Sequence, residues 1–286
     1  MFSLRILPAA ICAALMALPL AASAQSAAPT GSEAQISRLS DVLRMDDVID
    51  IMRQEGITYG RQLQEEMLEG RGGPTWDRAV DLIYDPATLR QRFDSVLEAG
   101  LADAPEAVAQ IESFFLSDLG QEILTLEIEA RRSLLDDAVE DAARARVEDM
   151  AQDADPRLEA LERFAEVNDL TEANVSGALN SNLAFFQGLA EQGALRDEMT
   201  EEQMLRDVWA QEADIREETL QWLFPYLALA YGPLTDEELE SYIQFSMSEA
   251  GQSLNNALFA AFDAVFASIS RDLGRAAARQ MMGDDI

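Results

Sequence analysis

Apolar positions recur along this chain at intervals of three and four residues, which is the spacing of amphipathic helices. No alternating run is long enough to predict a strand, and no Asn-Gly or Asp-Gly turn lies between β-branched residues. The pattern predicts helices over 36–44, 47–69, 76–83, 86–99, 104–116, 118–151, 157–167, 171–192, 201–230, 236–246 and 249–281. The predicted fold class is therefore all-α.

Two kinds of local signal mark where helices begin. Asp85 and Asp155 each precede a proline, which places a capping carboxylate next to a residue suited to the first helical position. Segments 200–203 and 235–238 each begin with Thr and carry Gln or Glu three residues later. This is the pattern of a capping box, in which each side chain accepts from the backbone amide of the other residue.

The chain also repeats a short motif, F-x-x-S-x-x-G-Q, at positions 114 and 245. The helical pairs predicted at 36–69 and 157–192 occupy matching places before it. Self-similarity of this kind predicts two related multi-helix units, a tandem repeat packed as one or two bundles, over 36–153 and 156–283. The motif residues are Phe114, Ser117, Gly120, Gln121, Phe245, Ser248, Gly251 and Gln252.

A structural explanation of this motif is available. Ser117 and Ser248 are suited to cap the long helices that follow them. Gly120 and Gly251 fall at the third helical position, where glycine costs about 1 kcal/mol relative to alanine. We expect the compensation to be close approach of another backbone, with the phenylalanines packed beside it. A ligand notch at this corner is the alternative, which we favour less.

This corner, an aromatic helix end followed by Ser, an acid, Gly and a polar residue, resembles the bacterial domain-of-unknown-function family 2059. The likeness is best over 234–260 and weaker over 104–130. Asp118 and Glu249 stand where the family often has proline, and Ser246 replaces a second aromatic residue. The resemblance implies a secreted or periplasmic helical protein and implies no activity or catalytic residue.

The N-terminus has the pattern of an export signal. Arg5 precedes an apolar run over 6–20, and the small residues at 22–24 predict cleavage after Ala24. Lipidation would need cleavage before Cys12, where the sequence context is poor. We therefore expect a signal peptide over 1–24, a flexible leader over 25–35, a periplasmic location and no transmembrane span in the mature chain.

The mature chain is strongly acidic. All 53 acids lie after the cleavage site and 20 of the 21 basic residues remain, so its formal charge is −33. Such a charge repels phosphate backbones and anionic lipid surfaces, which excludes general nucleic-acid binding. After cleavage the chain also lacks His, Lys and Cys. It therefore cannot form a Ser-His-Asp triad, a thiolate nucleophile or the common zinc sites.

No catalytic, metal or cofactor motif is visible in what remains. The adjacent carboxylate pairs at 65–66, 136–137, 201–202 and 217–218 lie on charged helix faces, where solvated side chains are the expected interpretation. The segment 174–176 has the form of a glycosylation acceptor, to which we assign no role. We expect no cofactor, no metal and no enzymatic activity.

Two apolar stretches, at 222–231 and 257–269, are apolar on nearly all sides and should be buried. The second has 13 residues and spans about 20 Å, too short to cross a bilayer. Core packing is the favoured explanation, with an apolar ligand pocket or a partner-binding face as alternatives. The residues of that candidate face are Trp222, Phe224, Tyr226, Phe259, Phe262 and Phe266.

Three functions stay open at this point. The leading hypothesis is a non-enzymatic periplasmic protein-interaction module that binds an envelope protein or associates with itself. The alternative is a carrier or sensor of a hydrophobic small molecule such as a lipid or quinone. A hydrolase that uses carboxylates is the third and least favoured.

Overall fold

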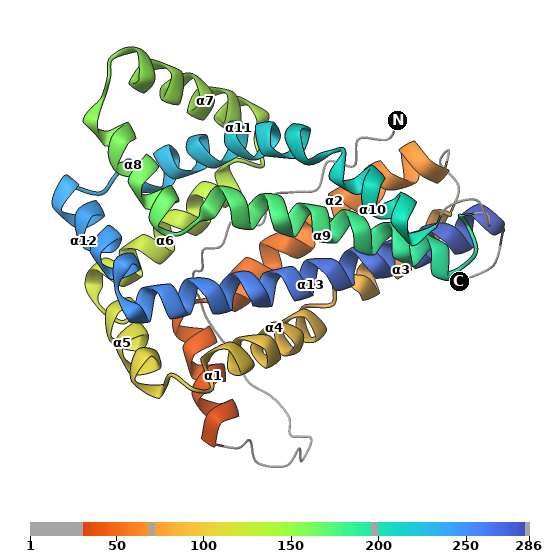
Figure 1. The fold of residues 1–286 in the computed structure, drawn as a ribbon, viewed down its shortest axis with the longest axis horizontal. Coiled ribbons are helices and arrows are strands. Elements are labelled where there is room, and N and C mark those ends of the chain that lie inside the picture. Colours follow the sequence, from red (N-terminus) through yellow and green to blue (C-terminus); the bar gives the residue numbers. More distant parts are fainter. Residues whose placement is uncertain (1–30, 69–71, 196–199, 284–286) are drawn as a thin grey trace.

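The computed structural model describes residues 31–68, 72–195 and 200–283, which form thirteen α-helices and no strand. The all-α prediction is confirmed. The helices, shown in Figure 1, are α1 (Gly31–Val42), α2 (Met45–Leu68), α3 (Gly73–Ile83), α4 (Pro86–Leu101), α5 (Pro105–Phe115), α6 (Asp118–Ser133), α7 (Asp137–Gln152), α8 (Pro156–Val167), α9 (Leu170–Glu191), α10 (Glu201–Trp209), α11 (Glu212–Tyr231), α12 (Asp236–Met247) and α13 (Glu249–Met282).

Two predicted helices are each broken in two. The helix expected over 118–151 divides into α6 and α7, because Asp136 leaves the helical conformation and its carboxylate accepts from the Ala138 amide. The helix expected over 201–230 divides at Ala210 and Gln211. Neither break contains Gly or Pro, so the sequence carried no strong stop signal at either place.

The start of the described chain differs from the prediction as well. Helix α1 begins at Gly31, so the end of the leader expected over 25–35 is helical. The predicted signal peptide over 1–24, and the leader as far as residue 30, lie outside the described residues.

Six helices, α1–α6, precede α7, and six, α8–α13, follow it. The first helix of one set corresponds to the first of the other, and so on through the sixth. We call these sets unit 1 and unit 2. Matching helices have similar lengths at the start of each unit, with 12 residues in both α1 and α8, and 24 and 22 residues in α2 and α9. The last pair differs most, since α6 has 16 residues and α13 has 34.

Local geometry repeats together with the order of the helices. Arg44 and Asp169, each directly before the second helix of its unit, have positive φ angles of 60° and 52°. Arg90 of α4 pairs with Asp46 at 2.6 Å, and Arg216 of α11 bonds to Glu172 at 2.8 Å. Both ion pairs join the fourth helix of a unit to the start of its second. Independent positions therefore support the same correspondence.

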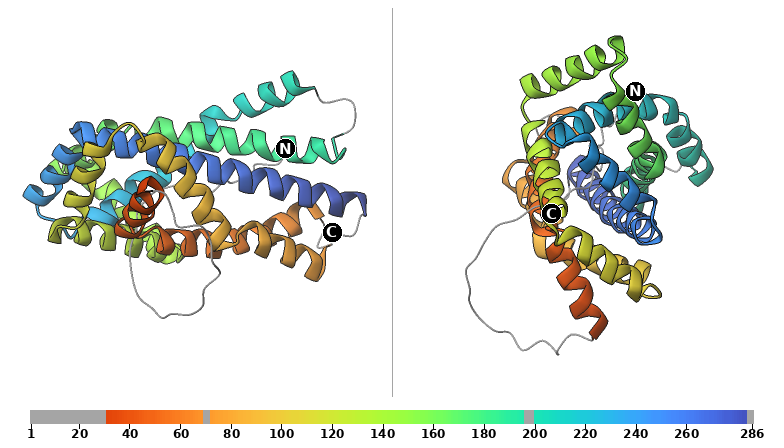
Figure 2. Two further views of the ribbon diagram at one scale, coloured as in Figure 1. Left: turned by 90° about the horizontal axis from the view of Figure 1, so that it is seen from below. Right: turned by 90° about the vertical axis from the view of Figure 1, so that its left-hand side faces the viewer.

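The two units share one hydrophobic core. Its buried residues run from Ile36 in α1 to Ala278 in α13. Helix α13 crosses the middle of the molecule, between α9 of its own unit and α4 of the other (Figures 1 and 2). The stretch predicted at 257–269 to be buried on nearly all sides is buried along one face only, by Ala257, Leu258, Ala261, Phe262, Val265 and Ile269. Its other residues are partly buried, except Ala260, which is exposed.

Helices α9 and α13 touch through a reciprocal pair of glycines. A Cβ atom on Gly188 would overlap the carbonyl oxygen of Arg271, and one on Gly274 would overlap the carbonyl oxygen of Phe185. Each glycine thus lets the other helix approach at backbone distance. The contact places α13 against α9 over much of its length.

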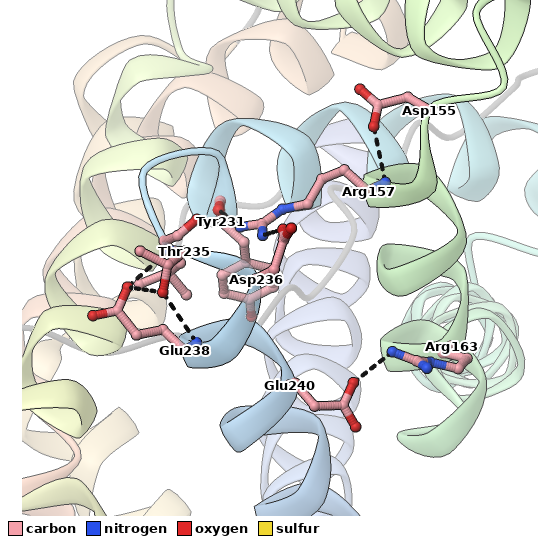
Figure 3. Close-up of polar contacts among 9 residues, drawn as sticks. Asp155, Arg157, Arg163, Tyr231, Thr235, Asp236, Glu238 and Glu240 are labelled. Atoms are coloured by element: carbon pink, nitrogen blue, oxygen red, sulfur yellow. Dashed lines mark hydrogen bonds and ion pairs between the residues drawn. The ribbon is translucent and has the colours of Figure 1, made fainter.

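A polar cluster attaches α8 to the turn between α11 and α12 (Figure 3). The Arg157 guanidinium donates to the carbonyl oxygens of Tyr231 and Leu234 at 2.5 and 2.7 Å, and it pairs with Asp236 at 2.7 Å. Thr235 and Glu238 form the predicted capping box at the start of α12. The box predicted at 200–203 and the caps predicted at Asp85 and Asp155 are confirmed too.

The glycine pair gives a stability prediction. Alanine at Gly188 or Gly274 should lower the free energy of unfolding by about 1–3 kcal/mol, because the new methyl group meets a fixed carbonyl. Gly177, also in α9, is the matched control, since its nearest neighbour for a Cβ is Asp263 at 3.8 Å. Gly177→Ala should raise stability by up to about 1 kcal/mol through helix propensity. Urea unfolding followed by circular dichroism measures all three, and equal effects would contradict the close contact.

Candidate functional site

The two copies of the repeated motif form matching helix corners. The hydroxyls of Ser117 and Ser248 accept from the backbone amides of Gly120 and Gly251 at 3.1 and 3.0 Å. A Cβ on either glycine would overlap the carbonyl oxygen at the end of the preceding helix, that of Phe114 or Phe245. The capping and the close backbone approach are as predicted, and the backbone that approaches belongs to the preceding helix of the same unit.

The corners also pack against each other. The rings of Phe114 and Phe245 stack with centroids 4.0 Å apart and planes inclined by 9°. The motif glutamines close each corner, since Gln121 donates to the Phe115 carbonyl at 2.6 Å and Gln252 donates to the Ser246 carbonyl at 2.8 Å. Every motif side chain thus has an architectural role, which favours the structural explanation over a ligand notch.

The predicted apolar face does not enclose a large cavity. Tyr226 and Phe262 are buried, and Phe262 packs edge-on against Phe93 at 4.9 Å. Trp222, Phe224, Phe259 and Phe266 are partly buried. Tyr226 and Phe259 line a pocket of only about 80 Å³. Common small-molecule sites measure roughly 300–1,000 Å³, so this space is too small for a lipid or quinone.

A buried carboxylate that the sequence analysis missed lies in the same pocket. Glu127 of α6 is fully buried, and the hydroxyls of Tyr231 and Tyr242 donate to its Oε1 atom. The tyrosines belong to unit 2 and the carboxylate to unit 1, so these bonds join the units. Its only sequence signal is an acid next to Ile128 on the inward face of α6.

The adjacent carboxylate pairs are not catalytic candidates. All eight residues, at 65–66, 136–137, 201–202 and 217–218, are exposed, as predicted for solvated faces. The second buried acid, Glu55 of α2, forms a two-point ion pair with Arg131, at 3.0 and 2.7 Å. This two-point contact gives both carboxylate oxygens of Glu55 a hydrogen bond.

A much larger space lies between the units, and we call it the inter-unit cleft. Its volume is about 600 Å³. Its walls come from α2, from the α6–α7 connection with α7, from α9 and from α11. Apolar and aromatic side chains contribute, including Leu134, Leu135, Ile215 and Trp222. Of the six residues of the candidate face, Trp222 alone lines this cleft.

Two residues with buried, unpartnered amide oxygens, of which Asn174 also lines the pocket of about 80 Å³, lie in the wall of the inter-unit cleft. Asn174 and Asn182 of α9 line it and are only 7% and 1% exposed. Their amide nitrogens donate to the Leu170 carbonyl at 2.7 Å and to the Gln211 side chain at 3.2 Å. Neither Oδ1 atom has a hydrogen-bond donor within the part of the chain that the structure describes. A buried acceptor left in this state costs about 1–3 kcal/mol, so these atoms need an explanation.

Tyr59 of α2 adds a third such group. Its hydroxyl is buried in the cleft wall and has no hydrogen-bond partner among residues 31–68, 72–195 and 200–283. Burial, with a smaller effect of Glu66, raises the pKa of Tyr59 well above its ordinary value. The hydroxyl therefore stays protonated and is available both to donate and to accept.

The repeat architecture does not require the two asparagines. The positions that match Asn174 and Asn182 in unit 1, by the register of Arg44 and Asp169, carry Ile49 and Ile57. Apolar residues therefore occupy the matching positions of α2, the corresponding helix of unit 1. The amides are a departure specific to the helix that faces the cleft, which is where a functional requirement is expected to override the local pattern.

The charge of the cleft lining is negative. It includes the acids Glu55, Asp137, Glu140 and Glu218 and a single base, Arg144. Arg131 neutralises Glu55, and Arg144 pairs with Glu140 and Asp141. Asp137 and Glu218 have no ion-pair partner in the described ranges. The lining therefore carries uncompensated negative charge next to aromatic and apolar surface.

The sequence analysis did not single out this site. Asn174 entered only as part of a glycosylation-like segment, and Tyr59 and Asn182 were not considered. The available signal was weak: two amides eight residues apart, with Ala178 midway, on one face of a largely apolar helix.

Comparison with protein-family models, curated proteins and solved structures found no match. The resemblance to the domain-of-unknown-function family 2059 therefore stays a prediction. In the described residues, no cluster of three or more His, Cys, Asp or Glu side chains is arranged to hold a metal ion. None of the described helices has the length and apolar character needed to span a bilayer.

The unpartnered amides give a second stability prediction. Asn174→Leu or Asn182→Leu should leave the free energy of unfolding unchanged or raise it by up to about 1 kcal/mol, because each removes a buried acceptor without a donor. Exposed Ser176→Leu, on the same helix, is the control and should change stability by less than about 0.5 kcal/mol. Losses above 2 kcal/mol at both buried sites, measured by urea unfolding, would mean that the amides serve the fold.

Proposed function

We propose that this protein is a non-enzymatic binding protein for a small organic molecule, which it holds in the inter-unit cleft. The observation that carries the proposal is a space of about 600 Å³ whose lining includes Asn174 and Asn182, two residues with buried oxygens that have no donor among the described residues. A pocket of this size with a few placed polar groups is typical of ligand sites. A ligand that donates hydrogen bonds would remove the cost of those acceptors.

The carboxylates support binding rather than catalysis. General acid catalysis needs a carboxyl group whose pKa is raised and which can reach the substrate. The buried acid of the cleft lining, Glu55, accepts hydrogen bonds from Arg131 on both carboxylate oxygens. The other acids of the cleft lining are Asp137 and Glu218, which are exposed, and Glu140, which pairs with Arg144.

The other functions expected from the sequence have less support. A lipid or quinone carrier needs a large apolar cavity, and the space beside Tyr226 and Phe259 is about 80 Å³. A protein-interaction role would use exposed apolar side chains, of which Leu82, Trp209, Leu116 and Met247 are the most exposed. Leu116 and Met247 stand at matching corners, and nothing about them indicates a particular partner.

We also propose that the protein works in the periplasm after export. The support is the sequence pattern at the N-terminus, in which Arg5, the apolar run over 6–20 and the small residues at 22–24 have the order of a cleavable signal. Small-molecule binding by an acidic, exported helical protein is compatible with the resemblance described above.

The cleft can be blocked with one substitution. Ala178 lies on α9 between the two asparagines, so Ala178→Phe should fill the cleft. Exposed Ser176→Phe on the same helix is the control for adding an aromatic ring. The measurement is thermal unfolding of the three proteins against a library of small organic molecules.

Compounds that bind the cleft should stabilise the wild type and Ser176→Phe, by about 2.7 kcal/mol at one hundred times Kd, and should not stabilise Ala178→Phe. Library compounds that stabilise all three proteins equally, with none sensitive to Ala178→Phe, would contradict the proposed site.

A further inference from the structure

We infer that the ligand of the inter-unit cleft is a small aliphatic amine, bound as its ammonium ion; the inference rests on the proposed binding function and names its ligand class. Three features of the cleft carry it: what its buried polar atoms need, what charge its lining holds, and what its apolar surface would cover.

The buried polar atoms call for hydrogen-bond donors. The Leu170 carbonyl can only accept, so the nitrogen of the Asn174 amide must face it and the oxygen must face away. The Asn182 oxygen is likewise without a donor, because its own nitrogen serves the Gln211 side chain. An ammonium group has three N–H donors and no acceptor, which suits either oxygen. The two asparagines are about 12 Å apart along α9, so one ammonium group can bind only one of them. A carboxylate or phosphate has no donor to offer them.

The charge of the lining selects the same class. Asp137 and Glu218 line the cleft without an ion-pair partner in the described chain, while the charge of Arg144 is taken up by Glu140 and Asp141. The whole chain carries a formal charge of −32 before any processing, which concentrates cations near its surface and repels anions. A cationic ligand is therefore attracted both by the overall negative charge of the protein and by the acids of the cleft lining.

The apolar surface suits a hydrocarbon stem. Leu134, Leu135 and Ile215 line the cleft beside Trp222. Methylene groups would cover the aliphatic side chains, and aromatic faces attract cations by about 0.5–2 kcal/mol. A sugar or another polyol would leave this surface without an apolar partner. An alkyl chain that ends in an ammonium group satisfies one of the amides, the acids and the apolar wall together.

The test uses three probes of similar length in titration calorimetry: cadaverine as the diamine, 1,5-pentanediol as its neutral counterpart and glutarate as the anion. Cadaverine should bind the full-length protein at physiological salt at least about tenfold more tightly than the other two. Asn182→Leu and Glu218→Gln should each weaken cadaverine binding, the first by about tenfold because a hydrogen bond to a charged group is lost. Glu217→Gln removes the same charge from the neighbouring exposed position outside the cleft and should have no effect.

The outcomes separate the amine inference from the cleft itself. If Asn182→Leu and Glu218→Gln bind cadaverine as tightly as the control Glu217→Gln, cadaverine is attracted to the acidic surface only, and the inference is overturned. Absent cadaverine binding, or preferred binding of the diol or glutarate, would overturn it as well. If Ala178→Phe abolishes binding of the preferred neutral or anionic compound, the cleft function stands and only the ligand class is wrong. If Ala178→Phe affects no bound compound, both proposals fail.

Discussion

The structure depends on one constraint: α13 cannot be buried by the unit to which it belongs. Gly188 and Gly274 let α9 approach one side of it at backbone distance, and α4 of the other unit covers another side. The stacked rings of Phe114 and Phe245 and the bonds from Tyr231 and Tyr242 to Glu127 join the units elsewhere in the same core. Because each unit supplies part of the other's interior, we expect the two to fold as one body.

The cleft lies beside the part of the structure in which the two units differ most, the last helix of each unit. In unit 2 the last helix continues for 34 residues through the centre of the molecule, whereas its counterpart α6 stops at Ser133 after 16. The chain then turns at Asp136 and α7 packs on α11 instead. Leu134 and Leu135, at this turn, form part of the cleft wall. The turn that ends the shorter repeat and the asparagines of α9 thus line the same space.

Much of the fold could be predicted from the sequence, because the residues that begin a helix or form a helix corner act on the backbone next to them. A carboxylate before proline caps a helix whatever surrounds it, so Asp85 and Asp155 marked two helix starts within a residue. The repeated motif likewise identified both corners, including the serine caps and the close glycines. The breaks at Asp136 and Gln211 were missed because neither Gly nor Pro marks them.

The candidate site was less predictable, for a physical reason. An asparagine at Asn174 or Asn182 reads as an ordinary helix-face residue until the burial of its oxygen is known, and burial depends on α2, α7 and α11 together. The aromatic face expected to bind a ligand belongs mostly to the core, since Tyr226 and Phe262 are buried in it and Trp222, Phe224 and Phe266 pack against it. Only Trp222 reaches the cleft.

The most direct test of a ligand in the inter-unit cleft is native mass spectrometry of the protein purified gently from the cells that make it. The account predicts a discrete added mass of a small organic molecule on the wild type, lost after denaturation and absent from Ala178→Phe purified in the same way. Wild type and variant that both carry the same added mass, or that both give only the bare chain after gentle purification, would contradict it.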